Sequence, residues 1–276
     1  MNRKKLLRGF TLIELAIVLV IIGLVLGGLF VPISAQMDMQ AFRKTNASLD
    51  EFKESLIGYA IINGRLPCPA TATSNGLESF CPSATGTCVG AETTTVQIHG
   101  NCSSQVNGVF SGFLPAASLG VSPQDAQGFA IDGWGGNAIN RIRYAVSPKT
   151  IGTQTFPFTA NNGMKSVGVT SLTSQTLLYV CGTKTAGTAP LATCTAAGAV
   201  QLTDSAVFVV YSVGKNAATG GTGTDEAVNP NPNSPNTNNN DVVFLSQNQT
   251  TTFDDVLLWV SSSTLISRMV SAGSLP

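Results

Sequence analysis

The sequence predicts an α+β protein in which one long N-terminal α-helix packs on an antiparallel β-sheet head domain with long loops. Three observations predict this fold. An apolar run covers Phe10–Val31, a helical stripe of apolar residues continues to Asn63, and the rest alternates short apolar runs with clusters of Gly, Ser, Thr and Asn. We therefore divide the 276 residues into a leader (1–9), a transmembrane half-helix (10–32), an amphipathic half-helix (33–63) and a head domain (64–276).

The N-terminal segment has the features of a retained membrane anchor. Its basic residues, Arg3, Lys4, Lys5 and Arg8, all precede the apolar run and should stay on the cytoplasmic side. At the helical rise of about 1.5 Å per residue the run spans about 33 Å, which is enough to cross a bilayer core. No small-residue cleavage site follows it, so we expect a single-pass protein with the head on the far side of the membrane.

Glu14 is the single charged residue inside this run. An ionised acid at the centre of a membrane helix costs about 2.5–3.5 kcal/mol or more, and such residues usually have a partner. If the chain were cut between Gly9 and Phe10, the new α-amino group would lie one turn from Glu14. In a bundle of similar helices, Glu14 would then neutralise the amine of a neighbour. The acid is thus predicted to be an assembly residue.

These residues resemble a known family. The stretch KKLLRGFTLIELAIVLVIIG is similar to the prepilin-type signal of type IV pilins and type II secretion pseudopilins. The resemblance implies that a prepilin peptidase cuts after Gly9, that Phe10 becomes a methylated N-terminus, and that Glu14 docks the subunit into a fibre. It implies as partners the other pilin subunits and an assembly platform in the bacterial inner membrane, with the head in the periplasm or in a fibre.

The amphipathic half-helix and the head are predicted from periodicity. The apolar stripe is Phe42, Thr45, Leu49, Phe52, Leu56 and Tyr59, which we expect to bury against the sheet. Candidate strands are Ile139–Val146, Leu177–Val180, Ala206–Val213, Val242–Leu245 and Val256–Val260, and residues 262–272 are predicted as a short terminal helix. Asn216–Asn240 is expected to be a long surface loop.

Two further stretches strengthen the resemblance to pseudopilins. LPCPA (66–70) follows the long helix, and DGWGGNAINRIRYAV (132–146) has the family's Asp, Trp-Gly and aromatic strand residue. We interpret Asp132, Trp134 and Gly135 as a turn that leads into the first strand of the sheet, with a structural role.

The six cysteines are Cys68, Cys81, Cys88, Cys102, Cys181 and Cys194. They form no CxxC pair, which argues against zinc-ribbon and thioredoxin-type sites, and an even number in an exported chain favours disulfides. We expect Cys181 to pair with Cys194 across a Thr/Ala-rich loop. The other four allow three connectivities, between which the sequence does not choose.

The stretch SVGKNAATGGTGTDEAVN (212–229) resembles the calcium loop of major pseudopilins. Calcium takes six or more oxygen ligands, so the resemblance implies Asp225 and Glu226 as candidate ligands. Asn216 stands where the family has Asp, and Ala227 replaces another acid.

Other function classes find little support. Charged residues make up 11% of the chain and its net charge is zero, so no basic footprint for nucleic acid exists and none is expected as a partner. No hydrolase, zinc-protease or phosphate-loop motif occurs, and we predict no enzyme. Asp254 and Asp255 are adjacent, and in a strand they would point to opposite faces.

The sequence therefore predicts a pilin-like structural subunit of a type II secretion pseudopilus or a type IV pilus. Its size favours a minor subunit, because the resemblance implies shorter major pilins. One alternative is a fibre-tip adhesin whose head loops recognise a surface or a cargo. A membrane-anchored enzyme is a third hypothesis.

Overall fold

A computed structural model describes most of the chain. It covers residues 11–84, 93, 99–103, 105–106, 109–135, 138–183, 193–194, 200–216, 225–229, 242–250 and 252–275, with the backbone alone for 26–34, 105–106 and 227. Gly9, Phe10 and Cys88 lie outside the described residues, as does most of the predicted loop at 216–240.

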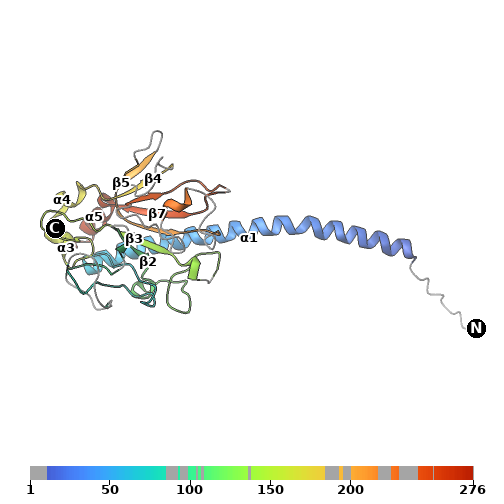
Figure 1. The fold of residues 1–276 in the computed structure, drawn as a ribbon, viewed down its shortest axis with the longest axis horizontal. Helices are drawn as coiled ribbons and strands as arrows, with labels where there is room; N and C mark the ends of the chain where they lie inside the picture. Colours follow the sequence, from blue (N-terminus) through green and yellow to red (C-terminus); the bar gives the residue numbers. More distant parts are fainter. Residues whose placement is uncertain are drawn as a thin grey trace, which may run out of the picture.

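The dominant element is the helix α1, Leu12–Asn63, which is 52 residues long. It begins at the N-cap Thr11 and ends at Gly64, whose φ of 66° lies in the left-handed region that favours glycine. Figure 1 shows the N-terminal half of α1 projecting from the head, while its C-terminal half lies within it. One continuous helix from the apolar run to Asn63 is what the sequence predicts.

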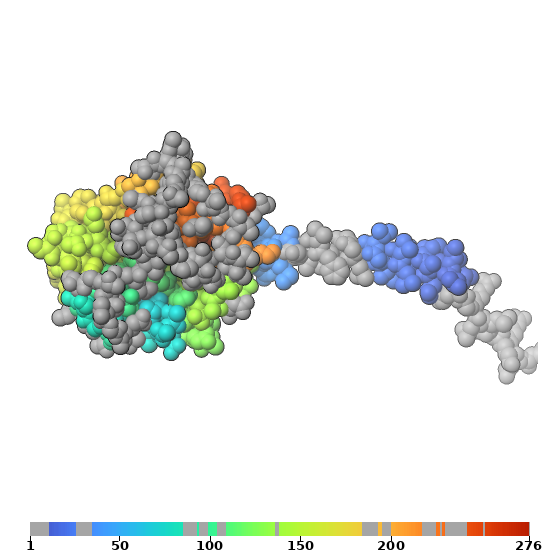
Figure 2. All heavy atoms as spheres, in the orientation of Figure 1, coloured from blue at the N-terminus to red at the C-terminus, as the bar shows by residue number. Residues whose placement is uncertain are grey.

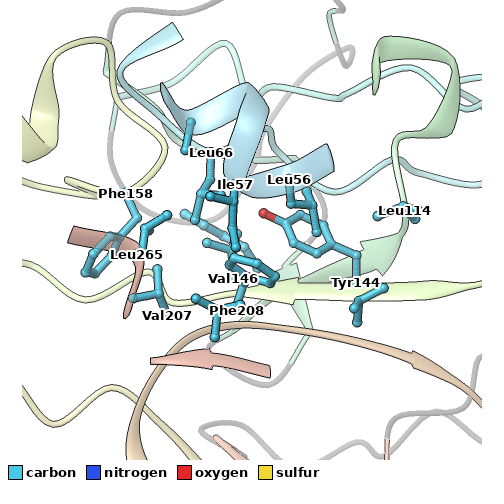
Figure 3. Packing of buried hydrophobic residues seen from close by; sticks show 14 of the residues in the cluster. Leu56, Ile57, Leu66, Leu114, Tyr144, Val146, Phe158, Val207, Phe208 and Leu265 are labelled. Carbon is cyan, nitrogen blue, oxygen red and sulfur yellow. The ribbon is translucent and has the colours of Figure 1, made fainter. Parts of the chain in front are cut away.

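The second half of α1 packs on the sheet through the predicted stripe. Thr45, Leu49, Phe52 and Leu56 are fully buried there. Figure 3 shows Leu56 and Ile57 of α1 meeting aromatic and aliphatic side chains of the head. Each buried Leu or Phe contributes about 1.5–3 kcal/mol, so this stripe fixes the head to the helix.

Within the described residues, seven strands form one sheet. They are β1 Gln105–Val106, β2 Val109–Phe113, β3 Arg143–Val146, β4 Leu178–Cys181, β5 Gln201–Ser212, β6 Val243–Leu245 and β7 Val256–Ser261. The order is β1-β2-β3-β5-β4-β6, and β7 pairs with β5. In β3, Tyr144 and Val146 point into the core below α1, whereas Ala145 belongs to a second cluster on the other face. The alternation is that of a strand with both faces covered.

The expectation of a purely antiparallel sheet is wrong, because β4 pairs with β6 in parallel, Val180 opposite Phe244. The sheet is therefore mixed. The long strand β5 follows β4 in the chain and runs antiparallel to it. β6 then lies on the other side of β4 and runs in the same direction as β4.

The strand boundaries also differ from the prediction. β1 and β2 precede β3, so the turn at 132–135 does not lead into the first strand. A 3-10 turn, η1 (Ala138–Asn140), replaces the start of the strand expected at Ile139–Val146. β5 begins five residues earlier than Ala206, on polar residues that alternate poorly.

The remaining described helices are short. They are α2 Ala116–Leu119, α3 Gly163–Val167, α4 Val169–Thr173, α5 Ser262–Ser271 and the 3-10 turn η3 Glu226–Val228. α5 was predicted, and Ser261 caps it by accepting a hydrogen bond from the Thr264 N–H. It packs against α1, where Arg268 forms an exposed ion pair with Glu54 at 2.6 Å.

The turn at 132–135 fastens α1 at the point where the helix enters the head. The Gly133 N–H donates to Thr45 Oγ1 at 2.9 Å, and Thr45 in turn donates to the Ala41 carbonyl. Asp132 is buried and accepts hydrogen bonds from the Trp134 N–H and from the Ser212 hydroxyl of β5. The turn therefore joins α1 to the sheet through side chains.

A buried ion pair fastens the other end of the helix. Arg65 and Glu78 make two parallel hydrogen bonds, 2.8 and 2.9 Å long, with both side chains almost fully buried. Glu78 also accepts from the Tyr59 hydroxyl and from the Cys68 N–H. Breaking such a pair by removing one partner typically costs 3–5 kcal/mol, because a buried charge is left alone.

Disulfides join Cys68 to Cys102 and Cys181 to Cys194. The second is the pair that the sequence predicts, and the first ties the segment after α1 to the segment that precedes β1. Cys81 is also disulfide-bonded.

We predict that Gly133→Ala destabilises the head. A Cβ at this position would collide with the carbonyl oxygen of Ala41 in α1, and backbone cannot move aside cheaply. Overpacking of this kind costs about 1–3 kcal/mol, which thermal unfolding of the purified chain would detect. Gly135→Ala is the matched control, since its Cβ would meet nothing within 4 Å. Equal unfolding temperatures for the two variants would contradict the fastening role of Gly133.

Candidate assembly site and acidic cluster

The first candidate site is the start of α1. Thr11 and Glu14 form a capping box: the Glu14 carboxylate accepts from the Thr11 N–H and hydroxyl, both at 2.9 Å, and the Glu14 N–H donates to Thr11 Oγ1 at 3.4 Å. The sequence analysis missed this arrangement, although the pattern Thr-x-x-Glu before an apolar run is its signal. Within one chain, the acid is thus hydrogen-bonded by Thr11.

The second feature is the surface that follows. Apolar side chains with exposures from 47 to 88% cover α1 between residues 12 and 25: Leu12, Ile13, Leu15, Ile17, Val18, Leu19, Val20, Ile21, Ile22, Leu24 and Val25. Figure 2 shows this part of the helix in blue, standing clear of the head. We call residues 12–25 the apolar surface of α1. An apolar surface of this kind marks contact with a membrane or another protein.

Among the described residues, no helix is both long enough and apolar enough to span a membrane.

The third feature is a cluster of carboxylates in the head. Glu226, in η3, lies beside Asp254 and Asp255, which directly precede β7, and the carboxylate oxygens of the three lie within 4.8 Å of one another. We call these three residues the acidic cluster. As adjacent residues of a strand, Asp254 and Asp255 are expected to point to opposite faces. They lie before the strand begins, so the alternation of strand side chains does not separate them.

Backbone and amide donors surround the acidic cluster. Asp254 accepts from the N–H groups of Lys215 and Asn216, while Glu226 accepts from the Asp254 N–H and from the Asn216 amide. Gly214, with a φ of 70°, allows this close approach, because a Cβ there would overlap the Asp254 carboxylate. The two predicted metal-loop positions Asn216 and Glu226 thus meet in space.

The side chain of Lys215, whose backbone N–H donates to Asp254, makes its ion pair with α1. Its ammonium is 2.7 Å from Asp38. Burial raises the pKa of Asp255 to about 8, with Asn229 opposing the shift by donating to the carboxylate. Burial and the nearby Glu226 raise the pKa of Asp254 to about 6, against the lowering effect of its backbone donors.

The acidic cluster fits a cation better than the predicted pair does. Asp225 accepts from the Gln247 amide at 3.2 Å and its carboxylate is not part of the cluster. Oδ1 of Asp254, in contrast, is buried and has no hydrogen-bond partner within the described part of the chain. Asp255 also lines a groove of about 370 Å³, together with α1, the segment 246–249 and the start of β7. A hard cation that prefers oxygen ligands suits these donors.

Comparison with known proteins supports the prediction of a prepilin-type signal at the N-terminus. The family described as the prokaryotic N-terminal methylation motif matches residues 5–30, which include Gly9, Phe10 and Glu14. The chain therefore carries, within residues 5–30, the N-terminal signal of type IV pilins and pseudopilins. The signal implies processing by a prepilin peptidase, membrane anchoring and assembly with other pilins. No curated protein and no solved structure matches the chain.

We predict that the head loses stability as the pH rises from about 4 through 8 in the presence of a chelator. The pKa of Asp255 is raised in the folded chain, so its neutral form stabilises the fold at low pH and this contribution disappears as the carboxyl ionises. Thermal unfolding followed by circular dichroism measures the slope, which Asp255→Asn should flatten.

Asp50→Asn is the matched control for this measurement, because Asp50 is an exposed acid on α1. It should keep the slope of the parent chain. If Asp255→Asn keeps that slope as well, the buried carboxyl does not govern the pH dependence.

Proposed function

We propose that this chain is a pilin-like structural subunit of a type II secretion pseudopilus or a type IV pilus. A prepilin peptidase removes the leader after Gly9, Phe10 becomes the methylated N-terminus, and the subunit joins a fibre through α1. The observation that carries the proposal is a coincidence in one segment. The methylation motif at residues 5–30 overlaps a projecting helix whose exposed side chains between residues 12 and 25 are apolar, with Glu14 the single charged one.

The apolar surface of α1 explains how one subunit serves in two places. Before assembly it lies among the lipid tails of the bacterial inner membrane, with the head in the periplasm. In the fibre, helices of other pilin subunits replace the lipid, because lipid tails and apolar side chains are equivalent solvents for it. An inner-membrane assembly platform would move the subunit from one state to the other.

Glu14 would favour the fibre over the membrane as the surroundings of α1. In the single chain its carboxylate takes two hydrogen bonds from Thr11, which lower the cost of an acid in an apolar surrounding but leave its charge uncompensated. The amine that cleavage creates on Phe10 of a neighbouring subunit would supply the missing charge. A charge-assisted pair in a medium of low dielectric constant is stronger than the neutral donors that it replaces.

We predict that Glu14→Ala still yields a chain that begins at methylated Phe10 but enters fibres at least about tenfold less often. The reason is that the Phe10 amine of the neighbouring subunit would be left without a counter-ion, and an unpaired charge within a membrane helix costs about 2.5–3.5 kcal/mol. Mass spectrometry of the membrane extract gives the N-terminus, and quantification of sheared fibres gives incorporation.

Glu51→Ala is the matched control, since Glu51 is an exposed acid on the half of α1 that lies within the head. It should assemble like the parent chain. Normal incorporation of Glu14→Ala, or an uncut leader in the parent, would refute the proposed processing and docking.

We also propose that calcium binds at the acidic cluster, and not at the pair Asp225 and Glu226 that the resemblance of 212–229 to a calcium loop implies. Glu226, Asp254 and Asp255 would hold the ion, and Asp225 would stay outside its coordination shell. The ion would add positive charge beside Oδ1 of Asp254, which is buried and has no hydrogen-bond partner within the described part of the chain. Calcium at this place would stiffen the turn at 214–216 next to α1.

We predict that calcium titrated into the detergent-solubilised full chain gives binding heat in the parent and in Asp225→Asn, but not in Asp254→Asn. At calcium about a hundredfold above its dissociation constant, the head should gain about 2.7 kcal/mol of stability. Absence of heat at millimolar calcium would reject the site. Loss of binding in Asp225→Asn with retention in Asp254→Asn would return the site to the pair expected from the sequence.

A further inference from the structure

The strand β7 leaves one side of the sheet open. Its residues 256–261 pair with Ser212–Ala206 of β5 in antiparallel register. Throughout the described residues, no other backbone or side-chain hydrogen bond reaches the backbone of Val256–Val260. Every second residue of an edge strand turns its N–H and C=O groups away from its partner, so a row of main-chain donors and acceptors lies free along β7.

The other two edge strands of the sheet, β6 and β1, offer few free main-chain groups within the described residues. At β6, the Asn229 side chain donates to the Leu245 carbonyl at 3.0 Å and accepts from its N–H at 2.8 Å, which replaces a neighbouring strand. β1 is two residues long and offers almost no edge. Natural sheets protect edges with short strands, charges, proline or bulges. β7 has six residues, reads VLLWVS and has neither a charge nor a proline.

The two faces of β7 differ in what a neighbour would meet. Val256 and Val260 are buried in the core below α1, and Leu258 packs at the margin of that core. Leu257 and Trp259 belong to the opposite face, where Trp259 is half-buried. A strand laid along β7 would therefore extend both apolar clusters, which favours a partner strand without charges.

The position of β7 indicates where such a strand would come from. β7 contacts α1, and Figure 1 shows it above the segment of α1 that runs from the projecting half into the head. Subunits that pack their α1 helices side by side bring a neighbouring head next to this edge. The occupant that fits is therefore the head of an adjacent subunit of the fibre.

We propose that the outer edge of β7 accepts an extended strand from the head of an adjacent pilin-like subunit, so that the sheet continues from one subunit to the next. This inference rests on the proposed function. Main-chain hydrogen bonds supply the attraction in strand addition, and the side chains on the two faces supply selectivity.

The test is photo-crosslinking in cells that assemble the fibre, using the full chain with a benzophenone amino acid in place of Trp259. We expect an adduct whose partner peptide, identified by mass spectrometry, comes from the head of a chain with the same N-terminal methylation motif. The same probe in place of Val270, which is exposed on α5, should give no such adduct. A probe in place of Val18, on the apolar surface of α1, reports helix-to-helix assembly.

A second variant tests the strand edge itself. Leu258→Lys adds the kind of charge that natural edges use against pairing and should lower the Trp259 adduct at least about tenfold. Leu202→Lys, at an exposed position of β5 outside the β7 pairing, should leave it unchanged. Thermal unfolding checks that both variants fold, and Trp259→Lys with the probe at Leu258 replaces Leu258→Lys if that variant does not.

The outcomes separate this inference from the proposed function. Adducts at Val18 without adducts at Trp259 would overturn strand addition and leave the function standing. Loss of both would overturn the function itself. A Trp259 adduct to lipid or to a protein without the motif, or one that Leu258→Lys leaves intact, would also overturn strand addition.

Discussion

The structure depends on one helix being buried on one half and exposed on the other. Leu49, Phe52 and Leu56 leave no accessible surface in the head, whereas Leu12 is 88% exposed at the opposite end. The hydrophobic effect holds the first group in the core of the head. It also favours transfer of the second group from water into a membrane or against another protein. Because α1 is continuous from Leu12 to Asn63, whatever the exposed half binds is mechanically joined to the head.

A joined helix transmits force or position only if it cannot pivot where it enters the head. The contacts at this point are short and directional: Gly133 lies against the Ala41 carbonyl and donates to Thr45, and Lys215 reaches Asp38. The far end is fixed by the buried pair Arg65–Glu78. Directional contacts at both ends of the buried half of α1 fix the orientation of the helix in the head. Apolar packing is not directional, so it would fix this orientation less strictly.

Local patterns in the sequence predict what local physics decides. The stripe around Leu49 and Phe52 has the helical period, and Glu14 is conspicuous because its cost in an apolar run is independent of the fold. Local patterns do not predict β2, because its Ser and Gly residues have low strand propensity. Its pairing with β3 stabilises the extended backbone instead. Local patterns do not predict the direction of β6 relative to β4 either, because alternation is the same in parallel and antiparallel strands.

The acidic cluster shows the same limit at the scale of a site. Glu226 and Asp254 are 28 positions apart in the chain but are linked by a 2.9 Å hydrogen bond, so a motif read along 212–229 finds the first and takes Asp225 as its partner. The fold brings these carboxylates together, because the segment that precedes β7 meets η3. The backbone N–H of Lys215 donates to Asp254, while its ammonium pairs with Asp38. The same lysine therefore holds one carboxylate of the cluster with its backbone N–H and fastens α1 with its ammonium, so the cluster and the entry of the helix into the head are joined at one residue.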